Sequence, residues 1–204
     1  MSNRSCFGVL MALFVVLFAV LAVAPREPAT WAMENAVAVL FVIGLWATRR
    51  WFRFSRSAYL MMFSFLALHE IGAHYTYSHV PYDQTLHTLF GFSPDAVMGW
   101  QRNQYDRFLH LLYGLLLVLP LSELCREWGG LRRPGAALFA FSLILASSLL
   151  YELIEWGAAV ALGDGSTAFL GTQGDPWDAQ KDMALATVGA LASLVIAALA
   201  RRIR

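Results

Sequence analysis

The sequence predicts an all-α membrane protein, a bundle of six transmembrane helices with both termini in the cytoplasm. Of the 204 residues, 58% are hydrophobic and only 14% are charged, whereas soluble domains carry about 25% charged residues. The mean hydropathy is +0.55. The apolar residues fall in blocks of roughly 17 to 22 residues, the length that crosses the hydrocarbon core as a helix. Barrel strands would alternate in polarity instead, so only helices are expected to span.

Six apolar blocks are long enough to cross the membrane, and we expect spans at residues 7–24, 31–48, 57–77, 106–123, 135–156 and 182–200. No other segment is long enough for a second domain, so residues 1–204 are predicted to form a single integral membrane domain. The first block ends in Ala22, Val23 and Ala24, which resemble a signal-peptide cleavage site. Its apolar run is long for a signal peptide and Pro25 would follow the cut, so we expect the block to be retained.

Basic residues are distributed unevenly between the two sides of the predicted membrane. Of 15 Lys and Arg, eleven lie at the two chain ends or in the segments after the second and fourth blocks. Because cytoplasmic segments carry the excess of Lys and Arg, both termini are expected in the cytoplasm. The mixed arginines and aromatic rings at 49–56 are therefore interpreted as a membrane anchor. Membrane lipids are the expected partners, and nucleic acid is not.

Acidic residues and histidines recur one helical turn apart inside the predicted spans. Two stretches share the pattern acid-x3-His-x2-Tyr, which places the acid and the histidine on one helix face: Glu70, His74 and Tyr77, then Asp106, His110 and Tyr113. Ionisable groups are costly in lipid, so they normally face the protein interior and mark a working site. Because these spans are consecutive, we expect them to be antiparallel neighbours that bring both acid–histidine pairs to a similar depth in the outer half of the membrane.

Carboxylate and histidine pairs on facing helices are a recurrent way in which helical bundles bind metals. We therefore predict a divalent metal, namely zinc, iron or manganese, because all three accept nitrogen and oxygen ligands. The predicted ligands are Glu70, His74, Asp106, His110 and Glu155. Glu152 and Asp182 are the predicted catalytic residues at the same outer surface. The leading hypothesis is a metal-dependent enzyme, a hydrolase or oxidoreductase that acts on a lipid or envelope substrate.

Two other functions would use the same residues. A carboxylate–histidine pair can relay protons without a metal, as in a small proton-coupled transporter. The polar residues stop in the outer half of the membrane, which disfavours a transport path because transporters bind their substrates near the midplane. The third interpretation is a structural or accessory membrane subunit, in which the same groups only form hydrogen bonds between helices.

The two longer outer segments contain signals for helix starts. The first is expected to hold a short helix, with Ser93 as its N-cap and Pro94 in its first turn. Before the last span, Asp175, Pro176 and Asp178 have the spacing of an N-cap, a first-turn proline and a first-turn acid. Helix capping accounts for these acids, and a functional role accounts for them equally. Both interpretations stay open.

Four stretches carry a family resemblance. They read His-Glu-Ile-Gly-Ala-His from His69, Asp-Arg-Phe-Leu-His from Asp106, Tyr-Glu-Leu-Ile-Glu-Trp from Tyr151, and Gln-Gly-Asp-Pro-Trp-Asp-Ala-Gln-Lys-Asp-Met from Gln173. In these stretches the sequence resembles the YjdF-like family of bacterial inner-membrane proteins. The resemblance implies a small multi-pass protein of the bacterial inner membrane. It implies no activity, substrate or catalytic residue, so the predicted site rests on the residues alone.

Overall fold

The fold is all-helical, as predicted. The structure, a computed structural model, describes residues 2–162 and 172–202, and these contain eight helices and no strand. The six long helices are α1 (Asn3–Leu21), α2 (Pro28–Thr48), α3 (Arg56–His74), α6 (Tyr105–Glu127), α7 (Arg133–Leu162) and α8 (Asp178–Arg202). Two short helices connect α3 to α6, namely α4 (Tyr82–Phe90) and α5 (Pro94–Met98). Each predicted span overlaps a long helix, and α4 has no counterpart among the expected helices.

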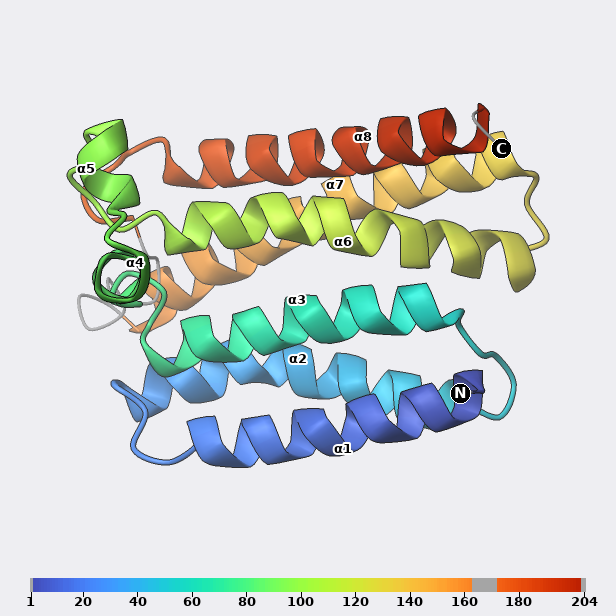
Figure 1. The fold of residues 1–204 in the computed structure, drawn as a ribbon, viewed down its shortest axis with the longest axis horizontal. Coiled ribbons are helices and arrows are strands. Elements are labelled where there is room, and N and C mark those ends of the chain that lie inside the picture. Colours follow the sequence, from blue (N-terminus) through green and yellow to red (C-terminus); the bar gives the residue numbers. More distant parts are fainter. Residues whose placement is uncertain (1, 163–171, 203–204) are drawn as a thin grey trace.

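The long helices form two groups of three that meet along α3 and α6. Helix α3 contacts α1 and α2, and α6 contacts α7 and α8. Figure 1 shows the long helices side by side, with α4 and α5 at the end opposite to both chain termini. The two short helices therefore cover the end of the bundle where the predicted polar residues gather.

Five helices in the described part of the chain are long and apolar enough to cross a membrane: α1, α2, α6, α7 and α8. Helix α3 has 19 residues, as α1 has. It falls outside this set because His69, Glu70 and His74 lower its hydropathy. The length and composition of the helices agree with a multi-pass membrane protein.

Two of the expected helix starts can be checked against the structure. The Ser93 hydroxyl accepts a hydrogen bond from the Ala96 backbone N–H at 3.2 Å, which confirms Ser93 as the N-cap of α5. Helix α8 begins at Asp178, later than the spacing predicts. The Asp175 side chain nevertheless accepts a hydrogen bond from the Trp177 backbone N–H, two residues on, at 3.0 Å, as an N-cap side chain does.

Helices α6 and α8 pack closely because small residues line their contact. A Cβ atom added to Gly114 would lie 1.9 Å from the Ala186 carbonyl oxygen, and one added to Gly189 would lie 2.1 Å from the Leu111 carbonyl oxygen. Small residues allow this approach, which is a common way for helices to associate in lipid. The contact fixes how α8 is placed relative to α6.

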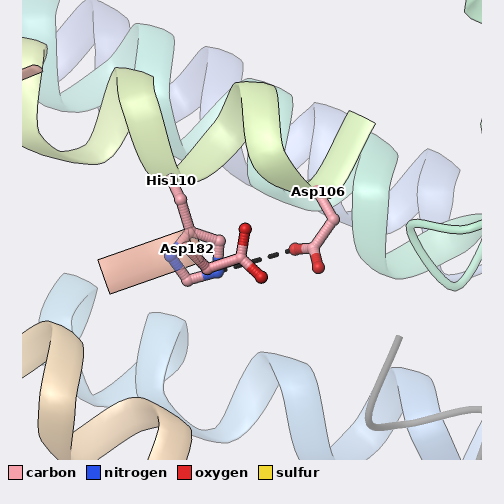
Figure 2. A group of neighbouring side chains, drawn as sticks. All are labelled: Asp106, His110 and Asp182. Atoms are coloured by element: carbon pink, nitrogen blue, oxygen red, sulfur yellow. Dashed lines mark ion pairs between the residues drawn. The ribbon is translucent and has the colours of Figure 1, made fainter. Parts of the chain in front are cut away.

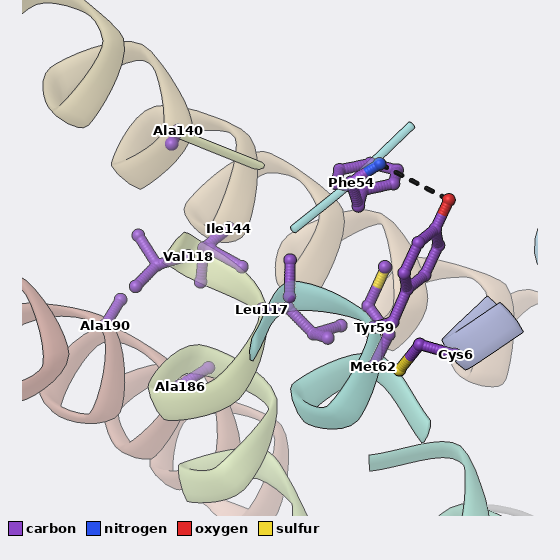
Figure 3. Packing of buried hydrophobic residues seen from close by; sticks show 11 residues of the cluster. Cys6, Phe54, Tyr59, Met62, Leu117, Val118, Ala140, Ile144, Ala186 and Ala190 are labelled. Carbon is purple, nitrogen blue, oxygen red and sulfur yellow. Dashed lines mark hydrogen bonds between the residues drawn. The ribbon is translucent and has the colours of Figure 1, made fainter. Parts of the chain in front are cut away.

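The main apolar core is built around this contact (Figure 3). Val118 of α6, Ile144 of α7, and Ala186 and Ala190 of α8 are each 0% exposed. Their complete burial indicates that α6, α7 and α8 are tightly packed where these four residues meet.

Candidate functional site

Three predicted site residues converge where α6 and α8 begin. Asp106 and His110 lie one turn apart on α6, and the His110 Nε2 is 3.6 Å from the Asp106 Oδ1. Asp182 faces them from α8, and one ligand atom from each of the three residues lies within 4.8 Å of the others. Figure 2 shows the three side chains directed toward one another. The donor set is one nitrogen and two carboxylates, which suits a divalent metal.

Helix α7 contributes a fourth member of this group. The Glu152 Oε1 lies 3.7 Å from the His110 Nε2. The Glu152 side chain is 9% exposed, and Asp182 is 2% exposed. Within the described residues, neither the Glu152 Oε1 nor the Asp182 Oδ1 has a hydrogen-bond partner. Buried carboxylate oxygens without partners are costly, so they point to a bound proton or cation.

The close packing of α6 against α8 positions these side chains. His110 lies one turn before Gly114 on α6, and Asp182 lies one turn before Ala186 on α8. Since Gly114 touches Ala186, the preceding turns of both helices are also held near each other. The site therefore lies one helical turn from the small-residue contact between α6 and α8.

An ion-pair network lies next to the site, where α6 and α8 begin. The Arg102 guanidinium is 2.6 Å from the Asp178 Oδ1, and Arg107 pairs with both Asp178 and Asp175. Lys181 donates to Asp175 as well, at 2.5 Å. The hydrogen bond from Lys181, together with those from Trp177 and Arg107, holds the pKa of the Asp175 carboxyl well below its usual range. The network ties the first turn of α6 to the start of α8.

Two predicted ligands lie away from this group. The His74 Nδ1 is 2.8 Å from the Leu21 carbonyl oxygen, so His74 meets the end of α1. Glu70, one turn before it, is 0% exposed. In the portions of the chain that are described, neither belongs to the set of converging ligand atoms. The two acid–histidine pairs are therefore not brought to one site, although α3 and α6 are neighbours as expected.

A cavity of about 580 Å³ lies between α2, α3, α6 and α7, and one end of it reaches the site. Asp106 and His110 line it, and so does Glu155, the remaining predicted ligand. His69 lines it from α3, and its Nδ1 is 2.7 Å from the Tyr77 hydroxyl. The side of α3 that faces α6 therefore carries His69 in place of Glu70 and His74.

Glu34 and Tyr151 form a hydrogen-bonded pair in the cavity, and neither was among the predicted site residues. Glu34 of α2 is 3% exposed and accepts a hydrogen bond from the hydroxyl of Tyr151 on α7. A single acid inside a predicted span was the available signal, because such a group normally faces the interior. Its partner is 117 residues away, so no spacing in the sequence indicates the pair.

The comparisons with known proteins agree with this architecture. The sequence matches the family described as "Predicted membrane protein (DUF2238)" over residues 7–203. It is 36% identical over 179 residues to the inner membrane protein YjdF of Escherichia coli (strain K12), which covers 86% of this chain and 81% of that protein. No solved structure matches. The matches confirm the resemblance seen in the sequence and the predicted location in the inner membrane. The chain belongs to the DUF2238 family of membrane proteins.

Proposed function

We propose that the chain forms a single membrane domain of six spans, α3 included, with both termini in the cytoplasm. Both termini lie at one end of the bundle (Figure 1), the end that also holds the α2–α3 and α6–α7 connections. Those connections and the chain ends carry most of the arginines. The positive-inside rule supports a cytoplasmic location for that end. The cluster of Asp106, His110 and Asp182 then faces outward.

We further propose a metal-dependent enzyme that hydrolyses a lipid or envelope substrate at this outward-facing site. The observation that carries the proposal is the convergence of Asp106, His110 and Asp182 beside Glu152. Three nitrogen and oxygen ligands leave a coordination position open for water, as catalytic zinc sites do. This ligand set differs from the sequence prediction. His74 meets the end of α1, and Glu70 and Glu155 are outside the converging set. Asp182, which was predicted to be catalytic, takes their place.

Each side chain has a defined task in this proposal. Asp106, His110 and Asp182 would hold the ion, which would supply a water of lowered pKa. The Glu152 carboxylate would accept the proton of that water and return it to the leaving oxygen of the substrate. The neighbouring pairs of Arg102 with Asp178 and of Lys181 with Asp175 hold the start of α8, and therefore Asp182, in place.

Elemental analysis of the detergent-purified protein tests the proposal. Near-stoichiometric zinc, iron or manganese is expected in the wild type. His110→Ala and Asp182→Asn should each lower the bound metal at least about tenfold, because the first removes one of three ligands and the second removes the negative charge of another. His74→Ala is the matched control and should retain the metal. No metal in the wild type after reconstitution with each ion would contradict the proposal.

The alternative, a small proton-coupled transporter, is favoured by one residue. Glu70 is 0% exposed, and neither of its carboxylate oxygens has a hydrogen-bond partner in the described segments. A buried carboxyl without a partner can take up and release a proton. Proton flux into vesicles that is lost in Glu70→Gln but kept in His110→Ala would support transport instead of hydrolysis.

A further inference from the structure

We propose that the cavity between α2, α3, α6 and α7 binds the hydrocarbon chain of a lipid, whose head-group oxygens lie at Asp106 and His110. The proposal rests on the proposed function, because it names the class of substrate for the same site. The length, lining, access and polarity of the cavity all fit one occupant, a membrane lipid with at least one long chain.

The cavity is as long as the hydrocarbon core of a membrane. It is lined on α6 from Asp106 to Leu124, and 18 residues of helix rise by about 27 Å. The hydrocarbon core of a bilayer is about 30 Å thick. An extended chain placed along α6 would therefore run from the polar site toward the opposite membrane surface.

Most of the cavity wall is apolar, and its size fits a small-molecule ligand. The volume of about 580 Å³ lies within the range of roughly 300 to 1,000 Å³ for ligand sites. A second helix, about 10 Å across, would need much more space over this length. Residues of all four helices line the apolar part: Phe41, Leu45, Phe65, Leu117, Leu121 and Leu143. Such a wall favours hydrocarbon over ordered water.

The cavity is open to one side along α2. Val37 and Phe41 line it, yet they are 47% and 37% exposed. Gly44, one turn further along α2, also lines it, and a Cβ atom added there would meet no atom within 4 Å. Because this side of α2 faces the bilayer in the proposed topology, a lipid chain can enter from the membrane without crossing water.

The outer end of the cavity offers polar groups without partners. His69 is 7% exposed and its Nε2 has no hydrogen-bond partner among the described residues, and the same holds for the Oγ of Ser148, which is 3% exposed. Both residues line the cavity together with Asp106 and His110. Buried polar atoms normally have partners. Head-group oxygens at this end would supply acceptors for both groups, next to the proposed metal ligands.

A cross-linking experiment on the purified full-length protein tests the proposal. The probe is phosphatidic acid with a diazirine near the end of one acyl chain, in vesicles of phosphatidylethanolamine and phosphatidylglycerol. Adducts are mapped by peptide mass spectrometry. In the wild type we expect adducts on buried cavity residues, such as Met62, Leu109 and Leu117, which are at most 9% exposed. Lipid that only surrounds the protein cannot reach them.

Two tryptophan variants supply the matched comparison. Gly44→Trp fills the cavity opening, whereas Gly8→Trp adds the same side chain to an open position on α1 that does not line the cavity. We expect Gly44→Trp to lower the buried adducts at least fivefold and Gly8→Trp to leave them unchanged. Leu143→Trp, on the α7 wall, should act as Gly44→Trp does. Size-exclusion profiles identify variants that fail to fold.

The cross-linking is repeated in EDTA, so that the lipid proposal and the metal proposal can fail separately. Binding of the lipid's hydrocarbon chain depends on the apolar wall of the cavity. Adducts on buried residues should therefore persist without metal. Buried adducts that depend on Gly44 support a lipid site even if elemental analysis finds no metal. Adducts confined to exposed residues, or equal buried adducts in Gly44→Trp and wild type, would overturn the lipid site even in a protein that binds metal.

Discussion

His110 is within ion-pair distance of two carboxylates from different helices, Asp106 at 3.6 Å and Glu152 at 3.7 Å. Asp182 completes a ring of three acids around one imidazole. Acids this close repel one another when ionised, so the group is stable only with protons or a cation among them. This concentration of negative charge in a buried position is the residue-level reason for preferring a metal site to a structural network.

Asp175 gives a prediction about pH. Its pKa is lowered by Lys181 first, then by the Trp177 N–H and Arg107. A carboxyl with a lowered folded pKa stabilises the protein fully above its unfolded pKa, and this contribution is lost as the pH falls below that value. The ordinary pKa is 3.8. The Tm of the purified protein should therefore fall on acidification below about pH 4, and this part of the fall should be absent in Asp175→Asn.

The control for this prediction is Glu27→Gln, a change at an exposed acid just before α2. It should leave the acid-dependent fall in Tm as in the wild type. An Asp175→Asn protein with an unchanged pH profile would show that the pairs with Lys181 and Arg107 contribute nothing to stability.

Part of the site could be predicted at this scale. Asp106 and His110 are one turn apart in the sequence, and helix geometry alone places them together. Their approach to Asp182 depends on α6 packing against α8, and the spacing of residues within one helix carries no information about its neighbours. Glu34 was missed for the same reason, because its partner Tyr151 belongs to a distant helix.

At the scale of elements, the contact between α6 and α8 positions the residues of the site. Gly114→Ala would place a methyl group 1.9 Å from the Ala186 carbonyl oxygen. The helices would have to separate, and overpacking of this kind costs about 1–3 kcal/mol. We expect a lower Tm and weaker metal binding, since His110 and Asp182 would move apart. Thermal unfolding and metal titration measure the two effects.

Gly44→Ala is the matched control, because it makes the same change inside a helix at an open position. It should leave Tm unchanged or raise it slightly, since alanine is favoured over glycine inside a helix by about 0.5–1 kcal/mol. Equal Tm values for Gly114→Ala and Gly44→Ala would show that the two helices are not held by this close contact.

The helices themselves were largely predictable, but the sequence did not indicate which face of α3 meets which neighbouring helix. Long apolar runs locate helices because the bilayer imposes their length. Glu70 and His74 share a face of α3 by spacing, as predicted, yet that face carries His74 toward Leu21 of α1. Phe65 and His69 occupy the side that meets the cavity. Which face meets which neighbour depends on contacts between segments far apart in the chain.

At the scale of the whole molecule, the proposed topology predicts which positions can be reached from outside the cell. Single cysteines at Gln84 and Trp51, introduced after replacing Cys6 and Cys125 by Ser, would lie at opposite ends of the bundle. Gln84→Cys should react with a membrane-impermeant maleimide in intact cells. Trp51→Cys should react only after the cells are opened. The reverse pattern would show that the topology is inverted, with Asp106, His110 and Asp182 on the cytoplasmic side.

The proposed ligands and the proposed base all come from α6, α7 and α8, whereas α2 and α3 supply the facing wall of the cavity. Reacting groups and much of the surface that selects the substrate are thus encoded by separate stretches of the chain. In the proposed enzyme, substitutions in α2 and α3 would change which molecules fit while leaving the proposed ligands in place. In that proposal, the amino-terminal half of the chain would help to select the substrate, and the carboxy-terminal half would supply the reacting groups.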